Sequence, residues 1–261
     1  NFHAGFQTTT SLNANYARGS ATATTTGTVT FTDSINMRGA VIGDQALTSI
    51  QYPAADNIDS GTGTVAFWVS PVNYVTPANA VQGIYQLFYL TGGDASRFGI
   101  QIQRNPNQAR LLFYSINYTS PANKYIVYDN SINWNNGSWH HVALAWNNAS
   151  VAMYVDGDAV GTQTLEAPYS SFSAKTIKTS YETSLPGRER TAIDELKIFS
   201  RMLSAEEIRA VFDYSQGNFI FSARYFPYAQ RVWVDELDFS QFANYQNVNY
   251  GRLQFRRNST G

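Results

Sequence analysis

Apolar and polar residues alternate clearly over two neighbouring segments in the middle of the chain. Val142, Leu144 and Trp146 share one face of the first segment if it is extended, because successive side chains of a strand point to opposite faces. The polar pair Asn147-Asn148 interrupts the run, and the alternation resumes directly after it. Asp156-Gly157 then supplies residues that accept positive φ, as a tight hairpin turn requires. The pattern predicts a strand, a polar turn, a second strand and an Asp-Gly hairpin.

A later segment predicts a strand that runs directly into a helix. Ser204 is a favourable residue for a helix N-cap, and Glu207 follows three residues later, as in a capping box. Leu203 and Ile208 occupy the two positions of a hydrophobic staple. Further apolar residues continue the face of Ile208 at helical spacing. We therefore expect one short helix near residues 204–212.

The composition favours strands and narrows the possible chemistry. Of the 261 residues, 15% are aromatic and 14% are charged, a balance that suits strands with polar outer faces. The chain has no cysteine, which excludes disulfides, thiolate metal sites and cysteine nucleophiles. Because the net charge is −1, we expect neither nucleic acid nor an anionic membrane as a partner. No apolar run reaches the roughly 18 residues of a membrane-spanning helix.

The patterned segments stand in a succession that is found in a known family. Residues 138–162 contain S-W-H-H-V-A-L-A-W and the Asp-Gly hairpin, and residues 192–212 contain I-D-E-L-K-I-F-S and the capped helix. Trp68 and Pro71 belong to a further strand, F-W-V-S-P. The succession resembles the laminin G-like, concanavalin A-like jelly-roll domains that bacteria attach to secreted carbohydrate-active enzymes and surface proteins. The resemblance covers roughly residues 40–213.

This resemblance implies an all-β fold, an antiparallel β-sandwich of the concanavalin A-like jelly-roll type with one short helix closing over an edge. We expect two sheets to stack face to face, with Trp68, Val142, Leu144 and Trp146 packed between them. We assign residues 1–215 to this laminin G-like domain.

Residues 216–261 form a C-terminal extension beyond the resemblance. V-D-E-L-D-F-S at 234–240 repeats much of I-D-E-L-K-I-F-S at 193–200, which favours a further strand, added to the sandwich or to a neighbouring subunit. Coincidence, or the start of a following domain, also fits. The chain begins with Asn1 and shows no signal peptide, so we expect a mature product or an excised module.

Carbohydrate binding requires exposed aromatic rings that stack on sugars, and amides that hydrogen-bond to hydroxyl groups. Tyrosines and asparagines cluster in one region of the chain. The candidate carbohydrate-binding residues are Tyr114, Tyr118, Tyr125, Tyr128 and Asn117. Because aromatic residues at strand spacing also occur as core residues or cross-strand pairs, both interpretations stay open.

Asp194 is the candidate metal ligand. In the jelly rolls that the chain resembles, the aspartate before the penultimate strand is often a calcium ligand or an acceptor that fixes a loop. Calcium takes about six to eight oxygen ligands, and Asp44, Asp59 and Asp156 lie in expected loops that could supply more. The alternative is that Asp194 accepts hydrogen bonds from backbone amides. Structural calcium is the one cofactor that we expect.

The sequence offers little support for catalysis. His140 and His141 are adjacent on a strand, so their side chains point to opposite faces and cannot bind one ion together. The related β-glucanases use an E-x-D-x-x-E pattern that supplies a pair of carboxylates, and this chain does not contain it. We therefore expect that the protein is not an enzyme.

Three functions fit these observations. The leading hypothesis is a non-catalytic carbohydrate-binding or adhesion module of an extracellular or cell-surface protein, with a polysaccharide or other glycan as its partner. The second is a structural subunit of a virion (a decoration or tail protein) or of a cell-surface filament, which contacts neighbouring subunits through its terminal segments. The third is a lyase or hydrolase that uses Asp194 or Glu195.

Overall fold

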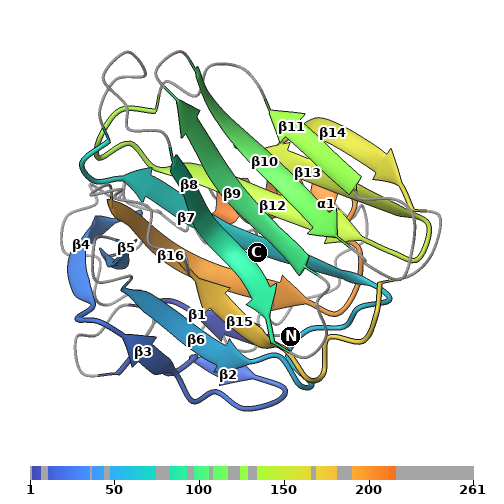
Figure 1. Ribbon diagram of the computed structural model, residues 1–261, viewed down its shortest axis with the longest axis horizontal. Coiled ribbons are helices and arrows are strands. Elements are labelled where there is room, and N and C mark those ends of the chain that lie inside the picture. The colour runs from blue at the N-terminus through green and yellow to red at the C-terminus, as the bar shows by residue number, and fades with distance from the viewer. Residues whose placement is uncertain are drawn as a thin grey trace, which may run out of the picture. The chain divides into compact units, whose positions relative to one another are not determined.

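The structure is a sandwich of two antiparallel sheets with one helix, α1 (Ala205–Ser215), among the described residues (Figure 1). It confirms the expected all-β jelly roll with a single short helix. It is a computed structural model that describes residues 2–6, 11–35, 37–43, 48–74, 83–92, 97–105, 108–116, 124–128, 134–165, 169–180 and 190–215.

The first sheet has seven strands in the order β11-β10-β9-β8-β15-β6-β3. All neighbouring strands in it are antiparallel. Their bounds are β3 (Thr24–Thr26), β6 (Ser49–Pro53), β8 (Gly83–Thr91), β9 (Arg97–Asn105), β10 (Gln108–Ile116), β11 (Lys124–Tyr128) and β15 (Thr176–Thr179).

The second sheet has nine strands, and its main path runs β14-β13-β12-β7-β16-β1-β2. One edge of β16 is shared, since its first residues pair with β5 and its last residues pair with β1, while β4 extends the sheet beyond β5. The bounds are β1 (Phe2–Ala4), β2 (Tyr16–Ala17), β4 (Thr30–Ser34), β5 (Met37–Gly43), β7 (Gly63–Pro71), β12 (His140–Trp146), β13 (Ser150–Val155), β14 (Asp158–Thr164) and β16 (Arg190–Phe199).

The core between the sheets contains three of the four residues expected there. Val142, Leu144 and Trp146 on β12 are fully buried in it, as predicted. Trp68 is also buried, but on the opposite face of β7, where its ring stacks on Phe212 of α1 at 5.5 Å. The prediction for Trp68 was wrong because β7 is buried on both faces, so its burial does not identify the side on which it lies.

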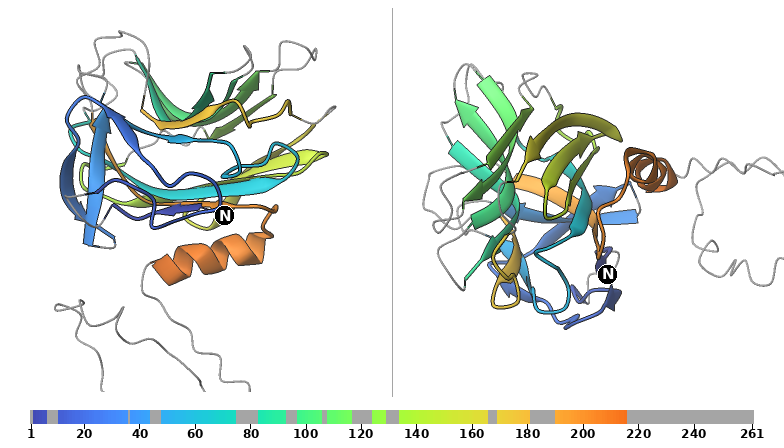
Figure 2. Two further views of the ribbon diagram at one scale, coloured as in Figure 1. Left: turned by 90° about the horizontal axis from the view of Figure 1, so that it is seen from below. Right: turned by 90° about the vertical axis from the view of Figure 1, so that its right-hand side faces the viewer.

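Helix α1 lies against the outer face of the nine-stranded sheet, as Figure 2 shows. Alanines form the floor on which it packs, and their small side chains let the helix approach the strands closely. The apolar cluster on this side consists of Ala66, Ala143, Ala145, Ala152, Tyr154, Leu203 and Ile208. The nine-stranded sheet is therefore covered on both faces at its centre.

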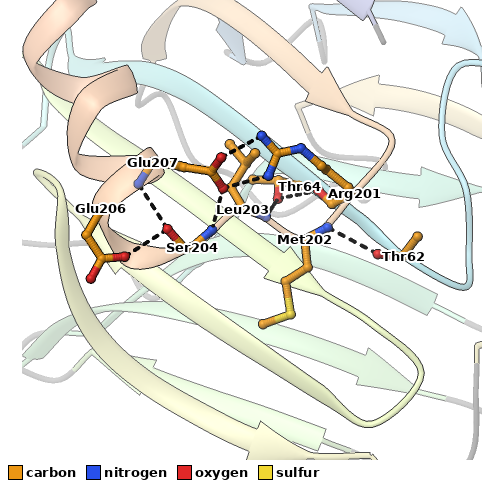
Figure 3. Close-up of polar contacts among 8 residues, drawn as sticks. All are labelled: Thr62, Thr64, Arg201, Met202, Leu203, Ser204, Glu206 and Glu207. Carbon is orange, nitrogen blue, oxygen red and sulfur yellow. Dashed lines mark hydrogen bonds and ion pairs between the residues drawn. The ribbon is translucent and has the colours of Figure 1, made fainter.

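The start of α1 is fixed by the predicted capping box (Figure 3). Ser204 N donates to Glu207 Oε2 at 3.0 Å, and Glu207 N donates to Ser204 Oγ at 3.3 Å. Leu203 and Ile208, the predicted staple, are both buried in the cluster under the helix. Arg201 adds two hydrogen bonds of 2.6 Å to the Glu207 carboxylate. Reciprocal capping satisfies backbone donors that a helix N-terminus otherwise leaves without partners.

A second anchor joins this segment to the sheet. Thr64 Oγ1 on β7 accepts a hydrogen bond from Leu203 N and donates one to Arg201 O, both at 2.9 Å, and Thr62 Oγ1 accepts from Met202 N at 3.1 Å. Figure 3 shows these contacts beside the capping box. The chain is thus held to the start of β7 immediately before the helix begins.

The predicted Asp-Gly hairpin joins β13 to β14. Asp156 and Gly157 have φ of 51° and 84°, as a two-residue type I′ turn requires at both positions. A Cβ atom on Gly157 would lie 2.7 Å from Arg209 Cδ. Glycine here therefore serves both the turn and the close packing of the helix.

Residues 216–261, with the expected strand at 234–240, lie outside the described residues. Their assignment as an extension to the domain at 1–215 stays a prediction. Among the described residues, no helix has the length and apolar character needed to cross a membrane.

Replacement of Ser204 by alanine removes the side-chain acceptor of the cap. We expect the free energy of unfolding to fall by about 1 kcal/mol, measured by urea denaturation with tryptophan fluorescence. Ser204→Asp, which retains an acceptor, should restore most of the loss. Equal stability of the alanine variant and the parent protein would show that the cap does not hold α1.

Candidate functional site

The outer faces of the two sheets differ, and this difference locates the candidate site. Helix α1 covers part of the outer face of the nine-stranded sheet, whereas no described helix covers the outer face of the seven-stranded sheet (Figure 2). We call the latter the open face; it is formed by the outward-pointing residues of β3, β6, β8, β9, β10, β11 and β15.

Strand register aligns a row of residues straight across the open face. Tyr114 on β10 pairs with Gly99, Gly99 pairs with Tyr89, Tyr89 pairs with Lys178, and Lys178 pairs with Gln51. Directly paired residues point to the same side of a sheet. Apolar neighbours along these strands, such as Phe113, Ile100 and Ile177, are core residues, so the row points outward.

Tyr114 is the first member of a hydrogen-bonded chain on this face. A Cβ atom on Gly99 would lie 2.9 Å from the Tyr114 hydroxyl, so the tyrosine can lean across β9 because residue 99 is glycine. Its hydroxyl donates to Gln86 Oε1 at 3.2 Å, and Gln86 Nε2 donates to Gln101 Oε1 at 3.0 Å. Among the described residues, no acceptor is bonded to the Gln101 amide nitrogen, and Gln101 is 6% exposed.

Next to this chain lies a second polar pair. Arg110 Nε donates to Gln103 Oε1 at 2.9 Å, across the β9–β10 pairing. Both side chains are partly exposed, as is Gln86. Val127 on β11 adds an apolar surface that is 41% exposed. Leu112, which pairs with Val127 and Gln101, lies on the same side and is buried. Among the described side chains, the face therefore presents amides, the Arg110 guanidinium and apolar groups within three neighbouring pairs of strands.

The structure places two of the residues that were predicted to bind carbohydrate, Tyr114 and Tyr128, on opposite sides of the seven-stranded sheet. Tyr114 is buried on the open face, and its strand partner is Tyr125, whose side chain is not among those described. Tyr128 lies on the other side of β11 and packs against the core. Tyr118 and Asn117 lie outside the described residues. A binding role for these residues stays a prediction, and Tyr114 is placed to hold Gln86 rather than to stack on a sugar.

Gln86, Gln101, Gln103 and Arg110 were not selected from the sequence. A signal was present, because the glutamines of G-I-Q-I-Q alternate with isoleucines that lie in the core. Period-two alternation predicts that they share one outward face. The alternation does not reveal which residues of the neighbouring strands pair with these glutamines. The strand register, which determines that pairing, brings the residues of the site together.

Asp194, the candidate calcium ligand, is fully buried in β16. Its oxygens accept hydrogen bonds from the Glu195 backbone N–H at 2.8 Å and from the Ser34 hydroxyl. These contacts agree with the alternative interpretation, that of an acceptor for backbone amides. Among the described residues, no three His, Cys, Asp or Glu side chains are grouped as a metal site would require. Calcium binding stays a prediction.

Glu195 follows in a β-bulge of β16, with a left-handed φ of 51°. Its carboxylate contacts His3 Nε2 at 3.1 Å and Lys197 Nζ at 2.8 Å. Burial by itself would raise the pKa of Glu195, but the hydrogen bond from His3 and the charge of Lys197 outweigh it and lower the pKa to about 2. The carboxylate is thus a buried, ionised tie between β16 and the N-terminal strand β1.

The two adjacent histidines point to opposite faces, as predicted. His141 is buried beside Trp68 and Phe212 under α1. Burial, assisted by the charge of Lys197, lowers the pKa of His141 to about 4, although Asp156 acts in the other direction. His141 is therefore a neutral packing residue near neutral pH.

His140 belongs to an arrangement that resembles a catalytic triad. Its Nδ1 atom lies 2.8 Å from Asp156 Oδ2, and its Nε2 atom lies 3.2 Å from Ser138 Oγ. These are the contacts of a Ser-His-Asp triad. Trp134 stacks on the imidazole at 4.3 Å, and Asp156 Oδ1 also accepts a hydrogen bond from His141 N. Asp156 thus fixes the hairpin onto β12.

The remaining contacts do not support nucleophilic catalysis by Ser138. Its hydroxyl donates to Asn135 O at 2.7 Å, so its proton does not point toward the imidazole. The backbone N–H groups of Gly137 and Ser138 donate to Pro71 O and Asn135 O. Acyl transfer needs such N–H groups directed at the developing oxyanion. We interpret the arrangement as structural.

Ionised Glu195 should make stability depend on acid pH. Since its folded pKa of about 2 lies below the unfolded value of about 4.3, its contribution is present above about pH 4.3 and is lost as the pH falls toward 2. Glu195→Gln should flatten the decline in unfolding free energy over this window, by on the order of 3 kcal/mol. Asp158→Asn, at an 81% exposed carboxylate, is the control and should leave the slope nearly unchanged. An unaltered slope in the glutamine variant would contradict the assignment.

Comparison with solved structures identifies relatives of this sandwich. The binding domain of Paraclostridial mosquitocidal protein 1 has a TM-score of 0.64 and 16% identity, over 82% of this chain and 51% of that one. The botulinum neurotoxin serotype G binding domain has a TM-score of 0.65 and 16% identity, over 81% of this chain and 50% of that one. A botulinum neurotoxin type C structure has a TM-score of 0.62 and 16% identity, over 81% of this chain and 50% of that one. The chain thus spans about half the length of these structures, and at such identity the likeness shows the fold.

A search of curated proteins found no match. The model of a protein family, described as the concanavalin A-like lectin/glucanases superfamily, matches residues 44–209. The match includes both segments on which the family resemblance was based, the strands around the Asp-Gly hairpin and the start of the capped helix. Since it covers more than half of the chain, this protein belongs to the concanavalin A-like lectin/glucanases superfamily.

Proposed function

We propose that the protein is a non-catalytic carbohydrate-binding module that recognises a glycan on the open face. The observation that carries the proposal is the chain Tyr114–Gln86–Gln101, which holds side-chain amides in place on a face that no described helix covers. A primary amide both donates and accepts hydrogen bonds, as the hydroxyl groups of a sugar do. Fixing the amides before binding reduces the entropy lost when the ligand is bound.

The family and its structural relatives support this proposal. The superfamily includes lectins as well as glucanases. Several of the similar structures are binding domains of toxins, and botulinum neurotoxin type C interacts with two ganglioside molecules. These properties belong to those proteins; for this chain they favour a binding role with a glycan as ligand.

The absence of catalysis is part of the proposal. A retaining glycosidase needs two carboxyl groups about 5 Å apart beside the scissile bond. The strands of the seven-stranded sheet contain no Asp or Glu, so none of them can supply such a group to the open face. Asp194 and Glu195, the pair considered for catalysis, are buried in the other sheet.

We also propose that the module acts outside the cell, on a cell or virion surface, where polymeric glycans are accessible. Assembly as a structural subunit through terminal segments stays a prediction, because residues 216–261 lie outside the described part of the chain.

Affinity electrophoresis of the full chain through gels that contain single polysaccharides tests the proposal. The panel includes neutral and acidic polymers. We expect at least one polymer to retard the protein. Gln86→Ala or Gln103→Ala should weaken that binding about tenfold, since each variant loses a hydrogen bond worth about 1 kcal/mol. Each also leaves the former partner of the glutamine, Gln101 or Arg110, without that bond.

The matched control is Gln163→Ala, the same replacement at an exposed residue of β14 in the other sheet. It should bind like the parent protein. Retardation by no polysaccharide would contradict carbohydrate binding. Equal weakening by all three variants would contradict the open face as its site, and the release of reducing ends from a bound polymer would contradict a non-catalytic module.

A further inference from the structure

Charge is distributed unevenly between the two sheets, although the whole chain has a net charge of −1. The strands of the nine-stranded sheet contain three Lys or Arg residues and four Asp or Glu residues. Those of the seven-stranded sheet contain no acidic residue and five basic residues: Arg97, Arg104, Arg110, Lys124 and Lys178. The near-neutral total thus conceals a basic sheet.

Two of these basic residues have described side chains on the open face. Arg110 shares it with Gln103, its hydrogen-bond partner. Lys178 stands in the row across the sheet, between Tyr89 and Gln51, and is 8% exposed. Lysine is rarely buried to this degree. Its position in the row places a positive charge among the polar side chains of the open face.

The contact to Arg110 also orients its guanidinium group. Gln103 Oε1 accepts the hydrogen bond from Arg110 Nε–H. Among the described residues, no acceptor is bonded to the two terminal nitrogens of the Arg110 guanidinium. Their N–H groups form the fork that binds the two oxygens of a carboxylate, or two oxygens of a sulfate ester. Held in this way, the side chain loses less conformational freedom when an anion binds.

The two charges are well separated. Arg110 lies four residues along β10 from the row that contains Lys178, roughly 13 Å, and β10 and β15 are three strand spacings apart, roughly 14 Å. Both separations exceed the screening length of about 8 Å at physiological salt. One small anion cannot contact both groups, whereas a polymer with repeated negative charges can.

We propose that the ligand of the open face is an anionic polysaccharide, whose carboxylate or sulfate groups pair with Arg110 and Lys178 while its hydroxyl groups bond to the amides of Gln86 and Gln101. This inference rests on the proposed carbohydrate-binding function and narrows it to one ligand class. Negative charge on the sugar chain, and not its backbone linkage alone, determines the affinity.

Matched pairs of polymers test the proposal, because the members of each pair differ in charge. Polygalacturonate is compared with its methyl ester, and dextran sulfate with dextran, by isothermal titration calorimetry of the full chain. We expect at least one charged polymer to bind tenfold or more tightly than its neutral partner at low salt. The pair in which this occurs distinguishes a carboxylate ligand from a sulfate ligand. The preference should shrink at 0.5 M NaCl, where the screening length is about 4 Å.

Arg110→Gln should weaken binding of the charged polymer about tenfold and leave the neutral one unaffected. Arg209→Gln is the matched control, since it removes the same charge from a 48% exposed residue of α1, and it should have no effect. Lys178→Met, checked for folding by circular dichroism, should act in the same direction as Arg110→Gln.

Equal affinity for both members of each pair would overturn the anionic ligand while leaving carbohydrate binding intact. Binding to no polysaccharide would overturn both proposals. Single-stranded DNA that binds as tightly as the best acidic polymer would overturn recognition of a polysaccharide in favour of polyanions in general. Equal losses in Arg110→Gln and Arg209→Gln would overturn the open face as the site.

Discussion

Strand β7 is buried on both faces, and this burial determines how the other layers are arranged around it. Its odd-numbered residues, such as Phe67, enter the core between the sheets, while Trp68 packs under α1. A strand of this kind is stable only if a second layer covers its outer side. The capping box of Ser204 and Glu207 and the bonds from Thr64 place the helix there. One outer face is thereby committed to structure, and the proposed binding site lies on the other.

The outer face of the seven-stranded sheet can carry polar side chains because it is not part of the core between the sheets. The isoleucines of β9 pack in the core, and the residues between them, which point outward, can be polar without disturbing that packing. Gly99 then lets Tyr114 cross its strand and hold Gln86 in place. The same independence allows the basic residues to gather on one sheet of a nearly neutral chain. Family membership supplies the sandwich, and these particular side chains supply the proposed ligand class.

Much of the fold was predictable because its signals are local. The Asp156-Gly157 turn and the cap at Ser204 each depend on a few neighbouring residues, and both were confirmed. The side on which Trp68 lies was not predictable, since a strand buried on both faces shows no alternation. The site was missed for a related reason: the meeting of Tyr114 with Gln86 depends on the register of three strands and on a glycine between them. Tyrosine clustering in the sequence did not carry that information, and it joined residues such as Tyr114 and Tyr128 that lie on opposite sides of the sheet.

We propose that the open face, and not the helix-covered face, binds the ligand. Titration of the isotopically labelled protein with an acidic oligosaccharide, followed by heteronuclear NMR, distinguishes the two faces. We expect the side-chain amide signals of Gln86, Gln101 and Gln103 and the Arg110 Nε–H signal to shift together and to fit one dissociation constant. The backbone amide signals of α1 should not shift. Saturable shifts confined to α1 and β14, with the glutamine signals unchanged, would contradict the proposal.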